Sequence, residues 1–253
     1  ELGANPVLGS TYSWSSTSGS FSSTSSNPKV KPTITQTYRL TETITATSCE
    51  NFNDVAITVN QRPTVNITSS PITICEGATL EVHMNVTAFG NWTITVNDGV
   101  INGSGSGDRI FIRNPNTLTA YYLVNAEDEH CTSQSSDLSG IVNVTVRPPF
   151  TSGSIAATGE TICYGGTPLT TIGSSLDGSG GDGVVTYSWR SSADGYTAAI
   201  TGATASTYLP PSGLTTTTSY RRYVNDGTCN TSPTVSTGTW VLTVRPQFTS
   251  GTI

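Results

Sequence analysis

The residues whose type and spacing could do chemistry are the five cysteines: Cys49, Cys75, Cys131, Cys163 and Cys229. Thiols can form disulfides, bind zinc or act as nucleophiles. A zinc site would need closely spaced Cys-x-x-Cys or Cys/His ligands, and the sequence has no paired motif of this kind. His130 precedes Cys131, but no histidine accompanies the other cysteines. The spacing therefore favours disulfides.

Four of the cysteines fall at matching positions in two copies of a repeated pattern. We predict one disulfide between Cys75 and Cys131 and another between Cys163 and Cys229. Each would close a loop of roughly 60 residues and stabilise its domain by about 4 kcal/mol in the chain-entropy model. That amount is comparable with the whole stability of a small domain. The alternative is that these residues are free thiols buried in a core.

Cys49 matches the second cysteine of each predicted pair. The matching first position falls before Glu1, so we expect Cys49 to be unpaired. Structural disulfides form and persist in oxidising surroundings. We therefore expect the chain to be extracellular.

The other polar residues indicate little catalytic chemistry. His83 and His130 stand in no pattern typical of a metal site, a catalytic triad or a general base, so we expect surface or strand positions for both. Asp177, Asp182 and Asp226 lie in glycine-rich turns, where they could contribute oxygen ligands to calcium. Aspartate and glycine are also the ordinary residues of tight turns, which is the simpler interpretation. We expect no catalytic residue, no cofactor and no resident metal.

Three tryptophans, Trp14, Trp92 and Trp189, occupy one equivalent position per repeat. Exposed, they could form a platform for sugars. A recurring aromatic residue on the strand after the first cysteine is more typical of the core of a sandwich domain. We therefore predict that all three are buried.

The elements that position these residues follow from a repeated seam. Val146–Ile155 returns almost letter for letter as Val244–Ile253, about a hundred residues later, which is the usual length of a β-sandwich domain. The seam reads as a last strand, a proline hinge and a first strand. We predict a truncated first repeat at 1–62, a second repeat at 63–147, a third repeat at 148–247 and the first strand of a following repeat at 248–253.

Composition and periodicity both indicate strands. Threonine and valine alternate in many short runs, and no segment shows sustained helical spacing of apolar residues. We predict an all-β chain, a tandem array of immunoglobulin-like antiparallel β-sandwich domains. Charged residues make up only 11% and the net charge is −6, with no basic face, so nucleic acid and anionic membranes are not expected partners. No apolar run approaches the roughly 20 residues that cross a bilayer.

An ordered set of short motifs completes the repeat. They are Thr-Ile-Cys-x-Gly at 73–77 and 161–165, Tyr-Ser-Trp at 12–14 and 187–189, Thr-Thr-Ser-Tyr-Arg-Arg at 217–222, Asp-Gly-Thr-Cys-Asn at 226–230 and the seam ending at 243–253. The set resembles the immunoglobulin-like and PKD-like tandem repeats of large cell-surface adhesins of gliding Bacteroidota, including the SprB type. The resemblance implies a non-enzymatic stalk that presents a distal binding region at the cell surface. Its partners would be neighbouring repeats, surface polysaccharide or other cell-surface proteins.

Two other functions compete with the stalk. A glycan-binding module is one, with the second repeat favoured because Asn91-Trp92 replaces the Tyr-Ser-Trp motif there and 102–108 forms a loop of its own. The other is an accessory domain of a secreted hydrolase. The prolines after Arg62 and Arg147 restrict the backbone at each seam, so we expect an extended chain on the order of 100 Å long, as a stalk requires.

Overall fold

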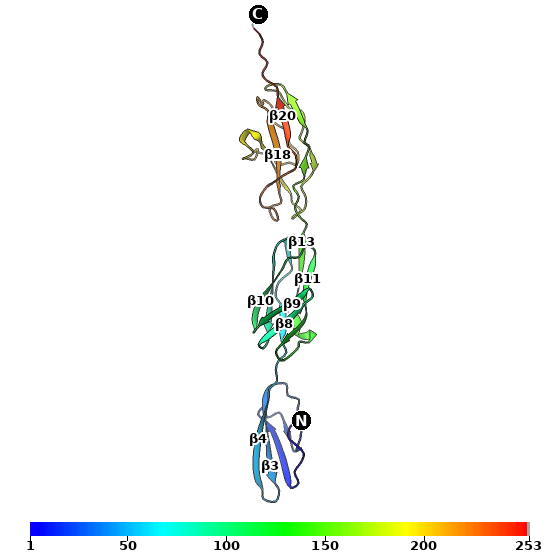
Figure 1. Ribbon diagram of the computed structural model, residues 1–253, viewed down its shortest axis with the longest axis vertical. Coiled ribbons are helices and arrows are strands. Elements are labelled where there is room, and N and C mark those ends of the chain that lie inside the picture. The colour runs from blue at the N-terminus through cyan, green and yellow to red at the C-terminus, as the bar shows by residue number, and fades with distance from the viewer. Residues whose placement is uncertain (252–253) are drawn as a thin grey trace. The chain divides into compact units, whose positions relative to one another are not determined.

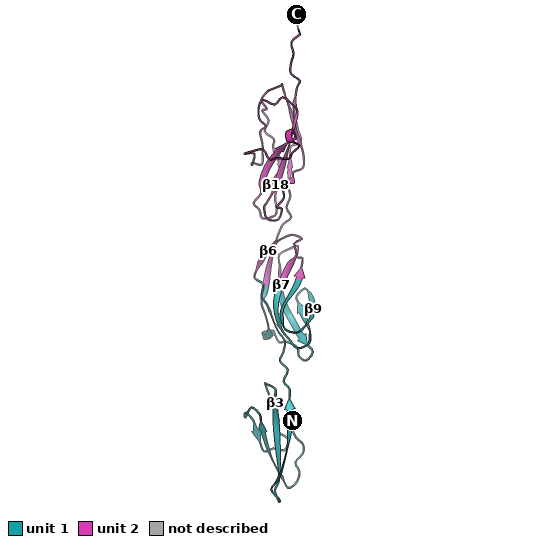
Figure 2. Cartoon of the chain, turned by 90° about the vertical axis from the view of Figure 1, so that its left-hand side faces the viewer, with its two compact units in different colours: residues 1–69, 83–111, 121–141 teal, residues 70–82, 112–120, 142–253 magenta. Residues whose placement is uncertain are grey.

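The computed structural model describes residues 1–251. Its regular structure is almost entirely strand (Figure 1), and the described residues add two short 3-10 turns, η1 (Ser135–Asp137) and η2 (Ser192–Asp194). The predicted all-β fold is confirmed. The chain splits into two compact units (Figure 2): residues 1–69, 83–111 and 121–141, and residues 70–82, 112–120 and 142–253. Within the described chain, each pair of strands lies inside 10–57, 64–147 or 154–244, while the exact repeat boundaries stay a prediction.

The first repeat contributes one antiparallel sheet in the order β2-β1-β3-β4. Its strands are β1 (Ser10–Ser16), β2 (Ser22–Ser23), β3 (Gln36–Ile44) and β4 (Cys49–Ile57). Trp14 on β1 and Tyr38 on β3 are buried with Leu2, and Phe21 packs against them. This small cluster is the core of the repeat.

The second repeat has two sheets, β10-β7-β5-β12 and β6-β13-β11-β8-β9. The strands are β5 (Thr64–Ile67), β6 (Ile72–Cys75), β7 (Leu80–Thr87), β8 (Asn91–Val96), β9 (Gly99–Ser104), β10 (Gly107–Arg113), β11 (Thr119–Asp128), β12 (Leu138–Ser139) and β13 (Ile141–Arg147). Strict alternation on β7 buries Leu80, Val82, Met84 and Val86. On β8, Trp92 is buried by the same alternation.

The third repeat has the sheet β15-β20-β18-β17, to which β19 adds, and the small pair β14-β16. Its strands are β14 (Ser154–Ile155), β15 (Gly159–Ile162), β16 (Ser174–Leu176), β17 (Thr186–Ser191), β18 (Thr218–Asn225), β19 (Thr234–Val235) and β20 (Trp240–Val244). Figure 1 shows β18 and β20 side by side. Trp189, Tyr220, Trp240 and Leu242 are the centre of its core.

One parallel pair recurs and fixes where the first cysteine of each repeat lies. β6 runs parallel to β13 with Cys75 opposite Arg147, the residue before the seam prolines. β15 runs parallel to β20 with Ile162 opposite Val244. The next position along this register places Cys163 beside Arg245. Both cysteines therefore lie at the end of their repeat's last strand.

The predicted first strand of a following repeat cannot be placed. Residues 245–251 form no strand, and Thr252 and Ile253, the counterparts of the strand residues Ser154 and Ile155, lie outside the described residues. Across residues 1–251, no helix combines the length and apolar character that a bilayer crossing needs.

Candidate functional site

The structure pairs the cysteines differently from the sequence prediction. Cys75 is bonded to Cys229, with their Cα atoms 5.5 Å apart. Cys49, Cys131 and Cys163 are free. The predicted pairs Cys75–Cys131 and Cys163–Cys229 are therefore wrong. Cys49 is free, and the expectation that its partner precedes Glu1 stays a prediction.

Strand direction explains the error. In the third repeat, β15 runs parallel to β20, so Cys163 lies where β20 ends. β18 runs antiparallel to β20, and Cys229 follows β18, so it lies where β20 begins. The two cysteines are at opposite ends of one sheet, and a disulfide needs Cα atoms within about 7 Å. The bond formed instead joins residues 154 apart in sequence, a loop worth about 5 kcal/mol in the chain-entropy model.

An aspartate shapes the loop that carries Cys229. Asp226 is buried, and its Oδ1 accepts backbone N–H bonds from Thr228 (3.1 Å) and Asn230 (2.7 Å). Its Oδ2 accepts one from Asp182 (3.1 Å). Burial acts to raise the pKa of Asp226, but these N–H bonds outweigh it, so the pKa lies below its usual value. The ionised carboxylate thus holds Cys229 in place.

The second repeat uses the same device three residues before Cys131. Asp128 Oδ1 accepts N–H bonds from His130 (2.9 Å) and Cys131 (2.8 Å), and its Oδ2 accepts one from Phe89 (3.0 Å). Burial again opposes ionisation, and the backbone bonds again bring the pKa of Asp128 below its usual value. Cys131 and Cys229 are therefore presented by equivalent loops.

Arg62 and Arg147, the arginines of the first two seams, each lie near an aspartate of the repeat that follows. Arg62 donates two hydrogen bonds to Asp137, from Nε to Oδ2 at 2.6 Å and from Nη2 to Oδ1 at 3.1 Å. The arginine lowers the pKa of Asp137 to about 2, with help from the Gln134 N–H. Arg147 Nη1 lies 3.9 Å from Asp182 Oδ2. The second contact is longer, Arg147 Nη1 makes no hydrogen bond within the described residues, and Asp182 comes from the segment before β17, whereas Asp137 ends η1.

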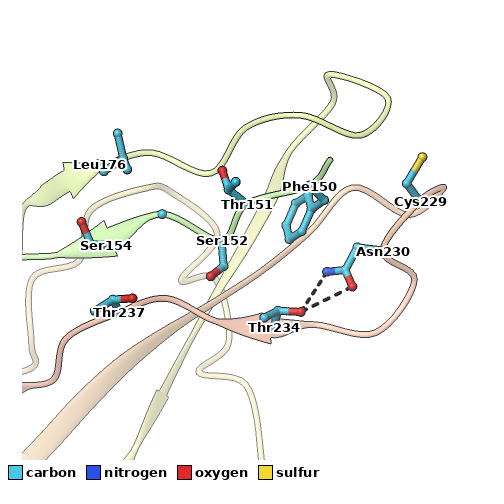
Figure 3. Close-up of a pocket in the computed structure, with 10 residues that line it drawn as sticks. Phe150, Thr151, Ser152, Ser154, Leu176, Cys229, Asn230, Thr234 and Thr237 are labelled. Carbon is cyan, nitrogen blue, oxygen red and sulfur yellow. Dashed lines mark hydrogen bonds between the residues drawn. The ribbon is translucent and has the colours of Figure 1, made fainter. Parts of the chain in front are cut away.

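A shallow pocket lies beside the second seam. Figure 3 shows Phe150, Cys229, Asn230 and Thr234 around it. The Asn230 amide donates to Thr234 Oγ1 at 3.1 Å, and the Thr234 hydroxyl donates to Asn230 Oδ1 at 3.4 Å. The Asn230 amide and the Thr234 hydroxyl thus bond to each other across the pocket. We interpret these residues as bracing the Cys229 loop and not as a ligand site.

The predicted burial of the three tryptophans is confirmed. Trp14 and Trp92 are each 4% exposed and Trp189 is fully buried. The indole N–H of Trp92 donates to the Gly105 carbonyl at 2.9 Å, and that of Trp189 to the Ala205 carbonyl at 3.0 Å. Both indole N–H groups thus donate to backbone carbonyls inside the domain. Because the rings are buried in the core, they offer no exposed flat face to a sugar.

The histidines and the turn aspartates have structural neighbours. His130 stacks on Phe89 with ring centroids 4.6 Å apart, and His83 is exposed on β7. Asp177 Oδ1 accepts a bond from Ser174 Oγ and lies 3.5 Å from the Arg222 guanidinium. In the part of the chain that the structure describes, no three histidine, cysteine, aspartate or glutamate side chains are grouped to hold a metal ion.

Sequence reasoning missed Arg222, the fully buried charge of the third repeat. Its guanidinium donates to Ser236 Oγ (3.0 Å), Ser174 Oγ (2.7 Å) and the carbonyls of Ser154 (3.2 Å) and Leu176 (2.9 Å). Burial lowers the pKa of Arg222 below its usual value. The alternation of β18 was the available signal, because it places Arg222 on the inward face with Tyr220.

Comparisons with known proteins concern the fold. Residues 151–246 match a family model described as a domain of unknown function (DUF8696). No curated protein matches the chain. Among solved structures, the chain is similar to a three-domain immunoglobulin fragment of titin (9% identity, 94% of this chain and 89% of that chain covered, TM-score 0.49).

Two further similar structures are multidomain fragments. One holds the three N-terminal domains of the Highly Immunogenic Outer Capsid protein of bacteriophage RB49 (11% identity, 96% of this chain and 91% of that chain, TM-score 0.42). The other holds domains EC1–3 of a mouse clustered protocadherin (10% identity, 87% and 82%, TM-score 0.37). The chain's own strand pairings define an all-β tandem of β-sheet repeats.

Proposed function

We propose that this chain is a run of structural stalk repeats from a secreted cell-surface adhesin or filament, and that it has no catalytic role. One observation carries the proposal. At two successive seams an aspartate-capped loop of the next repeat brings a cysteine to the seam, and the arginine that ends the preceding repeat lies near an aspartate of the next one. A spacer needs seams that are reinforced in the same way each time.

The two buried charged side chains of the third repeat, Arg222 and Asp226, have structural roles. Arg222 is surrounded by carbonyl and hydroxyl acceptors, and Asp226 by backbone N–H donors. A catalytic acid or base needs a pKa near the working pH and access to substrate. The pKa of Asp226 is shifted away from neutrality, which suits a loop cap. This supports a structural role.

Other observations support the proposed location and wider role. A disulfide is stable in an oxidising compartment, which supports an extracellular site. The resemblance to gliding adhesins of Bacteroidota supports a cell-surface stalk in gliding motility, with surface polysaccharide or other surface proteins bound at a distal region. The glycan-binding alternative loses its platform, because Trp92 is buried in the repeat that was favoured for it.

Small-angle X-ray scattering of the oxidised chain tests the proposal. A stalk should give a maximum dimension on the order of 100 Å, from sandwiches joined end to end. A compact protein of this length would have a radius of gyration of about 18 Å, and that value would contradict the stalk. The control is a variant with Cys75→Ser and Cys229→Ser, which should remain extended but with greater flexibility at the second seam.

A further inference from the structure

Four of the five cysteines form two classes, defined by where they lie in a repeat. The strand class, Cys75 and Cys163, lies where the last strand of its repeat ends, beside the seam arginine. The loop class, Cys131 and Cys229, lies three residues after the aspartate that caps its loop. The single disulfide of the described residues joins one cysteine of each class, from consecutive repeats.

The first seam holds a loop-class cysteine in the matching place. The Cys131 thiol lies 3.7 Å from the carbonyl oxygen of Asn60, two residues before Arg62. It therefore faces the end of the repeat that precedes it, as Cys229 does at the second seam. The Arg62–Asp137 ion pair fixes that seam next to the loop.

The third seam holds a strand-class cysteine. The Arg245 N–H donates to the Ile162 carbonyl at 2.9 Å, which continues the parallel register of β15 and β20 up to the seam. Cys163 follows directly and its side chain is exposed. Cys163 therefore lies beside Arg245 in the same way as Cys75 lies beside Arg147.

We propose that Cys131 and Cys163 are half-sites of disulfides between repeats. A strand-class cysteine of one repeat pairs with the loop-class cysteine of the next, so every seam with both classes is crosslinked. Each bond forms when two thiols release two protons and pass two electrons to a disulfide oxidant, such as glutathione disulfide or a disulfide-carrying oxidoreductase. Such bonds link successive repeats covalently and limit bending at each seam, whatever the array carries at its end.

An extended chain tests the proposal. In the extended chain, residues 1–253 are joined to a second copy of residues 156–247. The copy starts at residue 156 because residues 248–253 already match 150–155 except at one position. The added copy carries Cys163→Ser, to remove a second strand-class thiol, and Thr231→Ser at an exposed site, to give its Cys229 peptide a distinct mass. The chain is folded in a glutathione redox buffer, its thiols are blocked, and pepsin digestion at acid pH without reduction is followed by mass spectrometry.

We expect two linked peptides, Cys75 with the original Cys229 and Cys163 with Cys229 of the added copy. A Cys163 that stays alkylated, or that bonds to Cys229 of its own repeat, would overturn the proposal. So would loss of the Cys75 bond, because that bond also reports correct folding in the same sample. In the matched control, Cys163→Ser in the original copy should leave Cys229 of the added copy free for alkylation. Scattering decides the stalk separately, so the two proposals fail independently.

Discussion

Arg62 holds Asp137 through two hydrogen bonds, of 2.6 and 3.1 Å, across the first seam. The arginine ends the first repeat, and the aspartate ends the η1 turn of the second. Planar two-point pairing of this kind fixes direction as well as distance. The ion pair therefore orients the seam beside Cys131.

This pair should be visible in the titration of Asp137. We expect a carboxyl pKa of about 2 in the native chain, measured by NMR of the side-chain carbonyl carbon. Arg62→Met should raise it toward the ordinary value of 3.8, because the largest stabilising bond is lost. Arg39→Met is the control, since Arg39 pairs with Asp54 and should move only that carboxyl. An Asp137 pKa that is unchanged in Arg62→Met would contradict the ion pair.

Acid should destabilise the third repeat through Asp226. Its folded-state pKa lies below the ordinary 3.8, so the stability it contributes is present above pH 3.8 and is lost as the pH falls through the folded value. We expect urea midpoints that are level near neutrality and fall below about pH 4. Asp226→Asn should lower the midpoint at neutral pH and flatten the fall in acid. Equal acid dependence in both proteins would count against the loop cap.

Arg222 should be the most costly charge to remove. Arg222→Ala removes a fully buried side chain together with its hydrogen bonds to Ser236 Oγ and to the carbonyls of Ser154 and Leu176, so we expect about 3 kcal/mol or more of lost stability in the third repeat. Urea unfolding followed by tryptophan fluorescence measures it. Arg245→Ala, at an exposed position, is the matched control and should change stability by less than about 0.5 kcal/mol. Comparable losses in the two variants would disprove a special role for Arg222.

Local patterns predicted the strands and the core. The period of two in β7, β8 and β18 reports which side chains face inward, and the burial of Trp92 on β8 follows from it. The shared spacing of Asp128 before Cys131 and Asp226 before Cys229 was also visible, but its meaning was not. Only the folded loop shows that backbone N–H groups converge on each carboxylate.

The alignment of the repeats could not predict which cysteines pair. Register shows that Cys75 and Cys163 are equivalent, yet it does not say at which end of the sheet they lie. That depends on the parallel pairing of β6 with β13 and of β15 with β20, a long-range choice that leaves no local signature. Once the strand direction is known, a bond within one repeat is excluded by distance.

The most direct test is a disulfide map of the 253-residue chain, oxidised, alkylated and digested with pepsin at acid pH without reduction. The account expects one linked peptide that joins Cys75 to Cys229, with alkyl groups on Cys49, Cys131 and Cys163. Linked peptides that join Cys75 to Cys131 and Cys163 to Cys229 would contradict it, because each repeat would then be closed on itself and no bond would cross the seam.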